Sequence, residues 1–281
     1  MTRVERAGAS RGIAKWSVAL VFFVALTALL ASMQLYQVTA AGPAKATLRR
    51  SVAALSEIDP LLDRNYDALR TQASSAAPGN TVRLRDFPID VPLTRDEVLT
   101  SSKQQLRDLL LNRAADAMYA HGSGVLRESD VRTQSVGAFS VGGITTDGLG
   151  FLRSRNHSAL GVATLVLAAL CVMLATGLAL LCRGFGRLGS IGAVVLAAGA
   201  PMLLAGIGAR FYMRIVSGSQ TEYLQHAFLS IGQALAWIPI RDGLAFTALG
   251  AALVGLGVAG ALWADRAEAQ SPPFSLRSPG R

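Results

Sequence analysis

Charge is scarce in this sequence, and its scarcity is concentrated in four long stretches. Only 16% of the 281 residues are charged, whereas 51% are hydrophobic. The stretches without any Asp, Glu, Lys or Arg are Trp16 to Ala40, Ser158 to Cys182, Leu188 to Ala209 and Gly243 to Ala264. Because a helix of roughly 20 apolar residues crosses the apolar core of a bilayer, the sequence predicts four membrane spans. The missing charges argue against a pump, which needs ionisable groups along its path.

Cysteine and histidine are also rare, which limits the chemistry that the chain can support. Cys171 and Cys182 are the 2 cysteines, and both lie in the second stretch. The predicted outer domain therefore has no disulfide. We interpret Cys182, which lies beside Arg183, as a small apolar side chain, with acylation as the alternative. His121, His157 and His226 have no second histidine or cysteine at a metal-ligand spacing. We expect isolated surface histidines, no metal site and no cofactor.

Basic residues stand beside the apolar stretches in a pattern that indicates orientation. Residues 1–15 hold four basic residues against one acidic residue, and Arg183-Gly-Phe-Gly-Arg187 joins the second stretch to the third. Short cytoplasmic segments are typically rich in Lys and Arg. The sequence therefore predicts a multi-pass protein of the cell membrane with both termini in the cytoplasm and residues 41–156 outside.

The fold expected from these patterns is mainly α: a four-span α-helical integral membrane protein with a small α-rich (α+β) extracytoplasmic domain between spans 1 and 2. The predicted segments are a basic cytoplasmic tail (1–15), span 1 (16–40), the extracytoplasmic domain (41–156), span 2 (157–182), a basic cytoplasmic turn (183–187), span 3 (188–209), an extracytoplasmic loop with an amphipathic helix (210–242), span 4 (243–264) and a cytoplasmic tail (265–281). An alternative is that span 1 is a signal peptide cleaved before Ala41. Its apolar length favours an uncleaved span.

Local signals in residues 41–156 predict a helical domain with one extended segment. Apolar residues at helical spacing predict two helices that are separated at Asp59-Pro60, with Asp59 as the cap of the second. Thr81 to Arg85 alternates as a half-buried strand does. Two capping boxes, Thr94 to Glu97 and Ser102 to Gln105, predict helix starts, and Gly122 predicts a helix end. The glycine-rich segment 136–152 is left without a prediction.

Partners are limited by the charge balance of this domain. Residues 41–156 carry 15 basic and 13 acidic side chains, a net charge of +2. So small an excess argues against a nucleic-acid partner. The lipid bilayer is the expected partner, together with a membrane-protein partner or a second copy of the chain.

Small residues recur every four positions in spans 3 and 4, which predicts close helix contact. The predicted helix-packing positions are Gly189, Ala193, Ala197, Pro201 and Ala205 in span 3, and Thr247, Ala251, Gly255 and Ala259 in span 4. In the loop between these spans, a capping box at Ser219 to Glu222 predicts an amphipathic helix that stops at Pro239. Trp237 is expected near headgroup level, and Arg183 and Arg187 are expected to contact lipid headgroups.

Three motifs resemble catalytic or nucleotide-binding signatures without their structural context. Gly8-Ala-Ser-Arg-Gly12 has the spelling of a nucleophile elbow, but no sheet is predicted there to hold the serine. Gly184 to Gly189 and Gly255 to Gly260 match the dinucleotide pattern, which requires a preceding strand. Asp86, Asp90, Asp96 and Glu97 are candidates for an acid pair only through their proximity in sequence. We therefore predict no catalytic residues.

The favoured functional hypothesis is a noncatalytic membrane module that senses, binds or assembles through its extracytoplasmic domain. The alternative is a permease-like subunit of a transport complex, because the order of spans and loops is similar. The turn at 183–187 is too short for the helix that couples such permeases to an ATPase. A membrane-embedded enzyme is a third class, but the predicted spans offer it no acid or base.

Overall fold

A computed structural model describes residues 3–77, 79–125, 151–182, 184–217, 229 and 231–269. The chain divides into two compact units. We call residues 1–31, 164–207 and 238–281 the helix unit, and residues 32–163 and 208–237 the domain unit. The described residues are mainly α-helical, and four helices are long and apolar enough to cross a membrane, as predicted.

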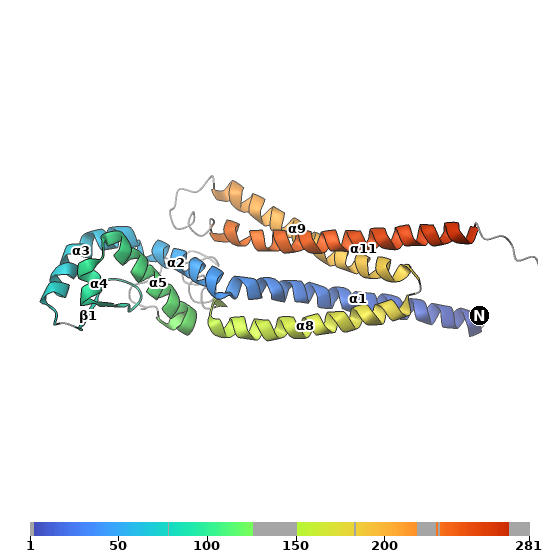
Figure 1. The fold of residues 1–281 in the computed structure, drawn as a ribbon, viewed down its shortest axis with the longest axis horizontal. Helices are drawn as coiled ribbons and strands as arrows, with labels where there is room; N and C mark the ends of the chain where they lie inside the picture. Colours follow the sequence, from blue (N-terminus) through green and yellow to red (C-terminus); the bar gives the residue numbers. More distant parts are fainter. Residues whose placement is uncertain are drawn as a thin grey trace, which may run out of the picture. The chain divides into compact units, whose positions relative to one another are not determined.

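Four long helices contain nearly all of the predicted spans (Figure 1), and each begins before its span. They are α1 (Arg3–Thr39), α8 (Ser154–Leu181), α9 (Gly186–Ser217) and α11 (Trp237–Ala269). The basic segment before span 1 joins α1 from Arg3 onward, because Arg, Lys and Glu are good helix formers.

The prediction that Pro239 ends a helix is wrong. This proline lies in the first turn of α11 and does not end a helix. Proline is well accommodated in a first turn because the backbone N–H that it lacks would have no intrahelical partner there. The capping box at Ser219 to Glu222 lies outside the described residues.

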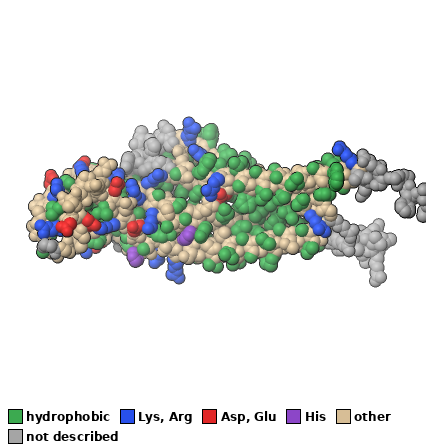
Figure 2. Space-filling view, viewed as in Figure 1, with side chains coloured by type: hydrophobic (Ala, Val, Ile, Leu, Met, Phe, Trp, Pro, Cys, Tyr) green, Lys and Arg blue, Asp and Glu red, His purple; other side chains and the backbone are tan. Residues whose placement is uncertain are grey.

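In the helix unit, the core is narrow and large apolar side chains cover the outside. Phe22 and Leu26 of α1 pack with Leu178 of α8 and with Val194 and Val195 of α9. Figure 2 shows hydrophobic side chains over much of the visible surface of the long helices. Exposed examples from each helix are Leu20, Leu165, Leu204 and Leu256.

Residues 41–125 form a compact domain inside the domain unit. Its elements are α2 (Ala41–Ser56), α3 (Ile58–Ser75), β1 (Thr81–Arg83), β2 (Pro92–Thr94), α4 (Arg95–Thr100), α5 (Lys103–His121) and the 3-10 turn η1 (Ser123–Val125). The two strands pair antiparallel, with Val82 opposite Leu93. Both residues are buried in a core that also takes Leu48 from α2 and Leu106 from α5.

Both predicted capping boxes are confirmed. Thr94 accepts a hydrogen bond from the Glu97 backbone N–H while the Glu97 carboxylate accepts one from the Thr94 N–H. The pair Ser102 and Gln105 does the same at the start of α5. Gly122 follows the last residue of α5 with φ of 81°, as its prediction as a helix end requires.

The prediction that Asp59 caps the second helix is wrong. Two helices are present, but the break lies at Glu57, which adopts the left-handed conformation with φ of 44°. Asp59 is therefore in the first turn of α3. Its carboxylate is free to bind Arg107 of α5 instead.

Candidate functional site

The strongest candidate is the place where α1 meets α2, because polar groups from three helices converge there around one buried residue, Thr39. Helix α1 ends at Thr39 and α2 begins at Ala41, so a single residue connects them. Thr39 is fully buried, and its hydroxyl donates to the Leu35 carbonyl at 2.8 Å. The Tyr119 hydroxyl of α5 donates to the Thr39 carbonyl at 3.3 Å. A side chain of the compact domain thus holds the last residue of α1.

His157, in the first turns of α8, contacts the same place. Its ring stacks on Tyr36 with the centroids 4.2 Å apart and the planes 14° from parallel. Gly161 leaves room for this stack, since a Cβ added to it would lie 3.1 Å from the tyrosine ring. We call Tyr36, Thr39, Tyr119, His157 and Gly161 the junction; all five belong to the domain unit. The expectation that His157 is an isolated surface residue is therefore wrong.

The hydrogen bonds of the junction determine which ring nitrogen of His157 carries a proton. Nδ1 lies 3.2 Å from the Tyr36 carbonyl oxygen and 3.3 Å from the Thr39 hydroxyl. A carbonyl can only accept, and the threonine proton is already donated to Leu35. Nδ1 is therefore the donor to both oxygens, a tautomer inferred from the network.

The core of the compact domain extends to both helices at the junction. Leu152, two residues before α8, is buried in the same cluster as Leu106 and Met118 of α5. Val38, in the last turn of α1, packs against that cluster. Apolar packing therefore accompanies the polar contacts at the ends of both helices.

Two of the four acidic residues considered as an acid pair, Asp90 and Glu97, are each paired with an arginine. Glu97 binds Arg113 through two hydrogen bonds of 3.0 and 2.5 Å, and Asp90 binds Arg83 at 2.8 Å. Burial alone raises the pKa of Glu97, but hydrogen bonds from Arg113 and Thr94 outweigh it, so the pKa of this carboxyl is lowered. A carboxylate that is held ionised by an arginine suits a structural role better than proton transfer.

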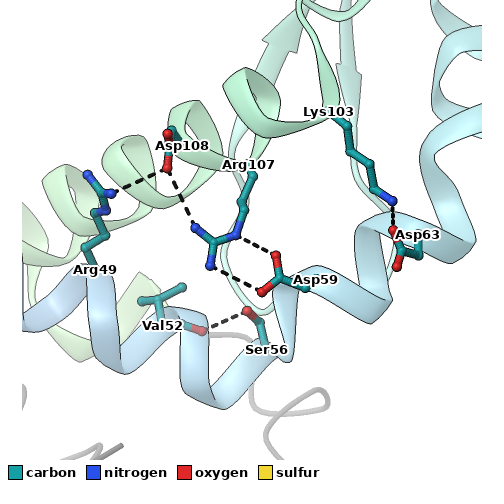
Figure 3. A network of polar contacts seen from close by, with 8 residues as sticks. All are labelled: Arg49, Val52, Ser56, Asp59, Asp63, Lys103, Arg107 and Asp108. Carbon is teal, nitrogen blue, oxygen red and sulfur yellow. Dashed lines mark hydrogen bonds and ion pairs between the residues drawn. The ribbon is translucent and has the colours of Figure 1, made fainter. Parts of the chain in front are cut away.

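A second polar network connects α2, α3 and α5 on the surface of the compact domain (Figure 3). Arg107 grips both carboxylate oxygens of Asp59, at 2.6 and 3.2 Å. Asp108 lies beside Arg107 and also binds Arg49 of α2 at 3.4 Å. Lys103 pairs with Asp63 next to them. The network fastens three helices, but its groups are already matched with one another and largely exposed.

In the helix unit, α9 and α11 approach through glycines that repeat every seven residues. Gly192, Gly199 and Gly206 of α9 are buried, as are Gly243, Gly250 and Gly257 of α11. A Cβ added to Gly250 would lie 2.5 Å from the Leu196 backbone nitrogen, and one added to Gly199 would lie 2.8 Å from the Thr247 nitrogen. The backbones therefore touch in a way that side chains would prevent.

The small residues predicted to pack at every fourth position do not all lie in one helix contact. Gly189 and Thr247 lie in the α9–α11 contact, facing Gly257 and Gly199 respectively. Ala193 and Ala197 line a groove against α1. The remaining predicted positions are exposed in this chain: Pro201, Ala205, Ala251, Gly255 and Ala259. Contact of these exposed positions with another helix stays a prediction.

A four-residue step rotates about 40° around a helix, whereas a seven-residue step rotates only about 20°. The seven-residue rows therefore stay in contact over a longer distance. Glycine at every seventh position was the signal in the sequence that would have found the contact.

The two stretches with the spelling of a dinucleotide motif pack against each other. A Cβ on Gly257 would lie 2.7 Å from the Gly189 nitrogen, and one on Gly260 would overlap the Phe185 ring. The glycines in these two stretches therefore allow close contact between α11 and the start of α9 with the turn before it. Ser10, from the other catalytic-looking motif, lies within α1 and not at a strand-to-helix turn.

Of the two arginines predicted to contact headgroups, Arg187 lies among the described residues. Arg187 donates through Nε to the Cys182 carbonyl at 2.9 Å, so it caps the end of α8, and Arg183 lies outside the described residues. Sequence reasoning missed Asp242, which is 5% exposed and binds the adjacent Arg241 at 3.0 Å. It was placed in a loop, but it lies within α11 and within the candidate span Ile231–Arg266.

These geometries define the class of protein only coarsely: a mainly helical chain compatible with a multi-pass membrane protein. Among the described residues, no group of three or more His, Cys, Asp or Glu could hold a metal ion. No family model, curated protein or solved structure matches this chain. Function must therefore be argued from the sites themselves.

Proposed function

We propose that the chain is a noncatalytic multi-pass membrane protein whose compact domain lies outside the membrane. When the domain binds its ligand or partner, the change in its conformation is transmitted to α1 and α8. The observation that carries this proposal is the junction, where Tyr119 of the domain holds Thr39 of α1 and His157 of α8 stacks on Tyr36. A sensor needs such a connection, because a binding event can act elsewhere only through contacts that differ between two states.

The form of the junction supports transmission better than simple tethering. A flexible linker would isolate a domain from its anchor, whereas here one residue separates α1 from α2. Three polar contacts converge on the buried Thr39. Buried polar groups are costly to leave unpaired, so the helix ends cannot move without either breaking these bonds or moving the domain with them.

Orientation is tested first, with cysteine labelling of the full chain in intact cells. Both native cysteines are replaced by alanine, and one cysteine is introduced either at the exposed Asp67 of α3 or at Leu188 of α9. We expect a membrane-impermeant maleimide to label Asp67→Cys in intact cells and Leu188→Cys only after permeabilisation. The reverse pattern would contradict the outward placement of the domain.

Transmission is tested by hydrogen–deuterium exchange on the purified full chain. Leu106→Ala weakens the core of the domain by about 2–5 kcal/mol. We expect amide protection to fall in residues 41–121 and also at 33–39 and 155–163. The same experiment is repeated in a chain that already carries Thr39→Val and Tyr119→Phe. There, adding Leu106→Ala should not change the amide protection of residues 33–39 and 155–163. Unchanged protection of both segments after Leu106→Ala alone would refute transmission.

A permease-like subunit gains no support from the geometry. Helix α8 ends at Leu181 and α9 begins at Gly186, so this turn has no room for a coupling helix.

A further inference from the structure

A groove of about 570 Å³ lies between α1 and α9 in the helix unit. Trp16, Leu20 and Phe23 form its α1 side, and small residues such as Ala193 and Ala197 form its α9 side. The volume is within the range of small-molecule sites, as is a lining that is mostly apolar with few polar groups. The groove therefore suits one apolar chain that carries a polar end.

Charge within the groove is placed at one end. Of the described residues that line it, Lys15 alone carries a charge, and Ser190 lies on the α9 side. Both α1 and α9 run away from this end in the same direction (Figure 1). The groove begins at Lys15 and Gly186 and reaches Phe23 and Ala197, so apolar residues follow the cation along its length.

The length of the groove matches one leaflet of a bilayer. From Gly186 to Ala197 a helix rises roughly 16 Å, and from Lys15 to Phe23 roughly 12 Å. Half of a bilayer's apolar core is about 15 Å thick. A lipid whose phosphate sits at Lys15 therefore has its acyl chain beside the full apolar lining. Trp16, 75% exposed and next to Lys15, is the residue type typical of headgroup level.

From this match of charge, polarity and length, we infer that the groove between α1 and α9 binds one anionic phospholipid, with the headgroup at Lys15 and an acyl chain against Ala193 and Ala197. A partner helix is a poorer match, because it would need an acidic residue placed against Lys15 at the edge of the membrane. The inference rests on the membrane insertion proposed above, but not on which side the domain lies.

The test uses tryptophan fluorescence of the full chain in vesicles. Trp237→Phe with Trp263→Phe leaves Trp16 as the reporter in the groove, and Trp16→Phe with Trp237→Phe leaves the exposed Trp263 as the control. The vesicles are phosphatidylcholine with a fixed fraction of acyl-brominated phosphatidylglycerol or acyl-brominated phosphatidylcholine in both leaflets. Because the leaflets are identical, the result does not depend on orientation.

We expect brominated phosphatidylglycerol to quench Trp16 with a preference of about fivefold over brominated phosphatidylcholine, the effect of one basic residue near a membrane surface. Lys15→Gln should abolish this preference, and Lys15→Arg should keep it. Ala197→Phe, which fills the groove, should also abolish it, whereas Ala251→Phe on the exposed face of α11 and Arg266→Gln should not. None of the groove substitutions should change the preference measured at Trp263.

Three outcomes would overturn the inference. Equal quenching of Trp16 by the two lipids means that there is no selective site, and a preference that survives both Lys15→Gln and Ala197→Phe means that the lipid binds elsewhere. Disulfide-linked dimers through Leu20→Cys in a chain without Cys171 and Cys182, formed equally with and without phosphatidylglycerol, mean that a second copy fills the groove. If neither lipid quenches Trp16 or Trp263, membrane insertion itself fails.

Discussion

The compact domain and the helix unit distribute the same residue types in opposite ways. In the domain, large apolar side chains such as Phe87 and Leu110 are at most 1% exposed, and the ion pairs lie outside. In the helix unit, glycines of α9 and α11 are buried, while Leu165 and Trp263 are both 72% exposed. Figure 2 shows the contrast as acidic and basic colours over the domain and hydrophobic colour over the long helices.

This contrast is compatible with water around the compact domain and lipid around the long helices. Water drives large apolar side chains into a core, because their burial removes apolar surface from water. Lipid gives no such drive, so helices in lipid associate through close backbone contact and small residues. A helix pair that buries glycine and exposes leucine is unfavourable in water and favourable in a bilayer.

A leucine-to-alanine substitution should have a large effect on stability in the compact domain and a small effect in the helix unit. Leu110→Ala removes a fully buried side chain from α5 and should cost about 2–5 kcal/mol of domain stability. Leu165→Ala on α8 removes one that is 72% exposed and should cost less than about 0.5 kcal/mol. Urea unfolding of the full chain in detergent measures both losses, followed by exchange of the α5 amides for Leu110→Ala and of the α8 amides for Leu165→Ala. Similar losses at the two positions would show that α8 is buried against another surface.

The reverse comparison adds a methyl group to the helix contact. Gly250→Ala places a Cβ 2.5 Å from the Leu196 nitrogen, so the backbones must separate, at a cost of about 1–3 kcal/mol. A Cβ on Gly255, in the same helix, would meet no atom within 4 Å. Gly255→Ala should therefore leave stability equal or higher, because alanine favours helix. Thermal unfolding in detergent compares them, and equal melting temperatures would exclude the glycine contact.

The elements that could be predicted from the sequence depend on neighbours in the chain. The capping box of Thr94 and Glu97 is one example, since both partners lie within four residues. The cap at Asp59 was mistaken because the left-handed residue is Glu57, a residue type with no special preference for that conformation. The stack of Tyr36 on His157 joins residues 121 positions apart, and no local pattern indicates such a pair.

The compact domain should lose stability in acid because the Glu97 carboxylate becomes protonated. The exposed apolar side chains of the long helices do not titrate. The folded-state pKa of Glu97 is below the ordinary value of 4.5, so its stabilising contribution is complete above 4.5 and is lost as the pH falls through the lowered pKa. Glu97→Gln keeps the cap but replaces charged hydrogen bonds with neutral ones, which should cost about 1 kcal/mol at pH 7. Unfolding measured from pH 7 to pH 3 should show this difference shrinking toward zero. Asp67→Asn removes an exposed carboxylate as a control, and an equal pH response of the two variants would contradict the assignment to Glu97.

The smallest expected effect concerns the surface network, because water weakens the attraction between exposed ion pairs even where their hydrogen-bond geometry is good. A double-mutant cycle of Asp59→Asn with Arg107→Gln should give a coupling energy of about 0.2–1 kcal/mol, although two hydrogen bonds join the pair. The side chains are 63% and 31% exposed, so salt screening should reduce the coupling at 1 M salt, where the Debye length is about 3 Å. The pair Arg83 and Asp90, which lie 2.8 Å apart and have 60% and 43% exposed side chains, should couple less. A coupling above about 2 kcal/mol that persists in salt would mean that this face of the domain is shielded from water.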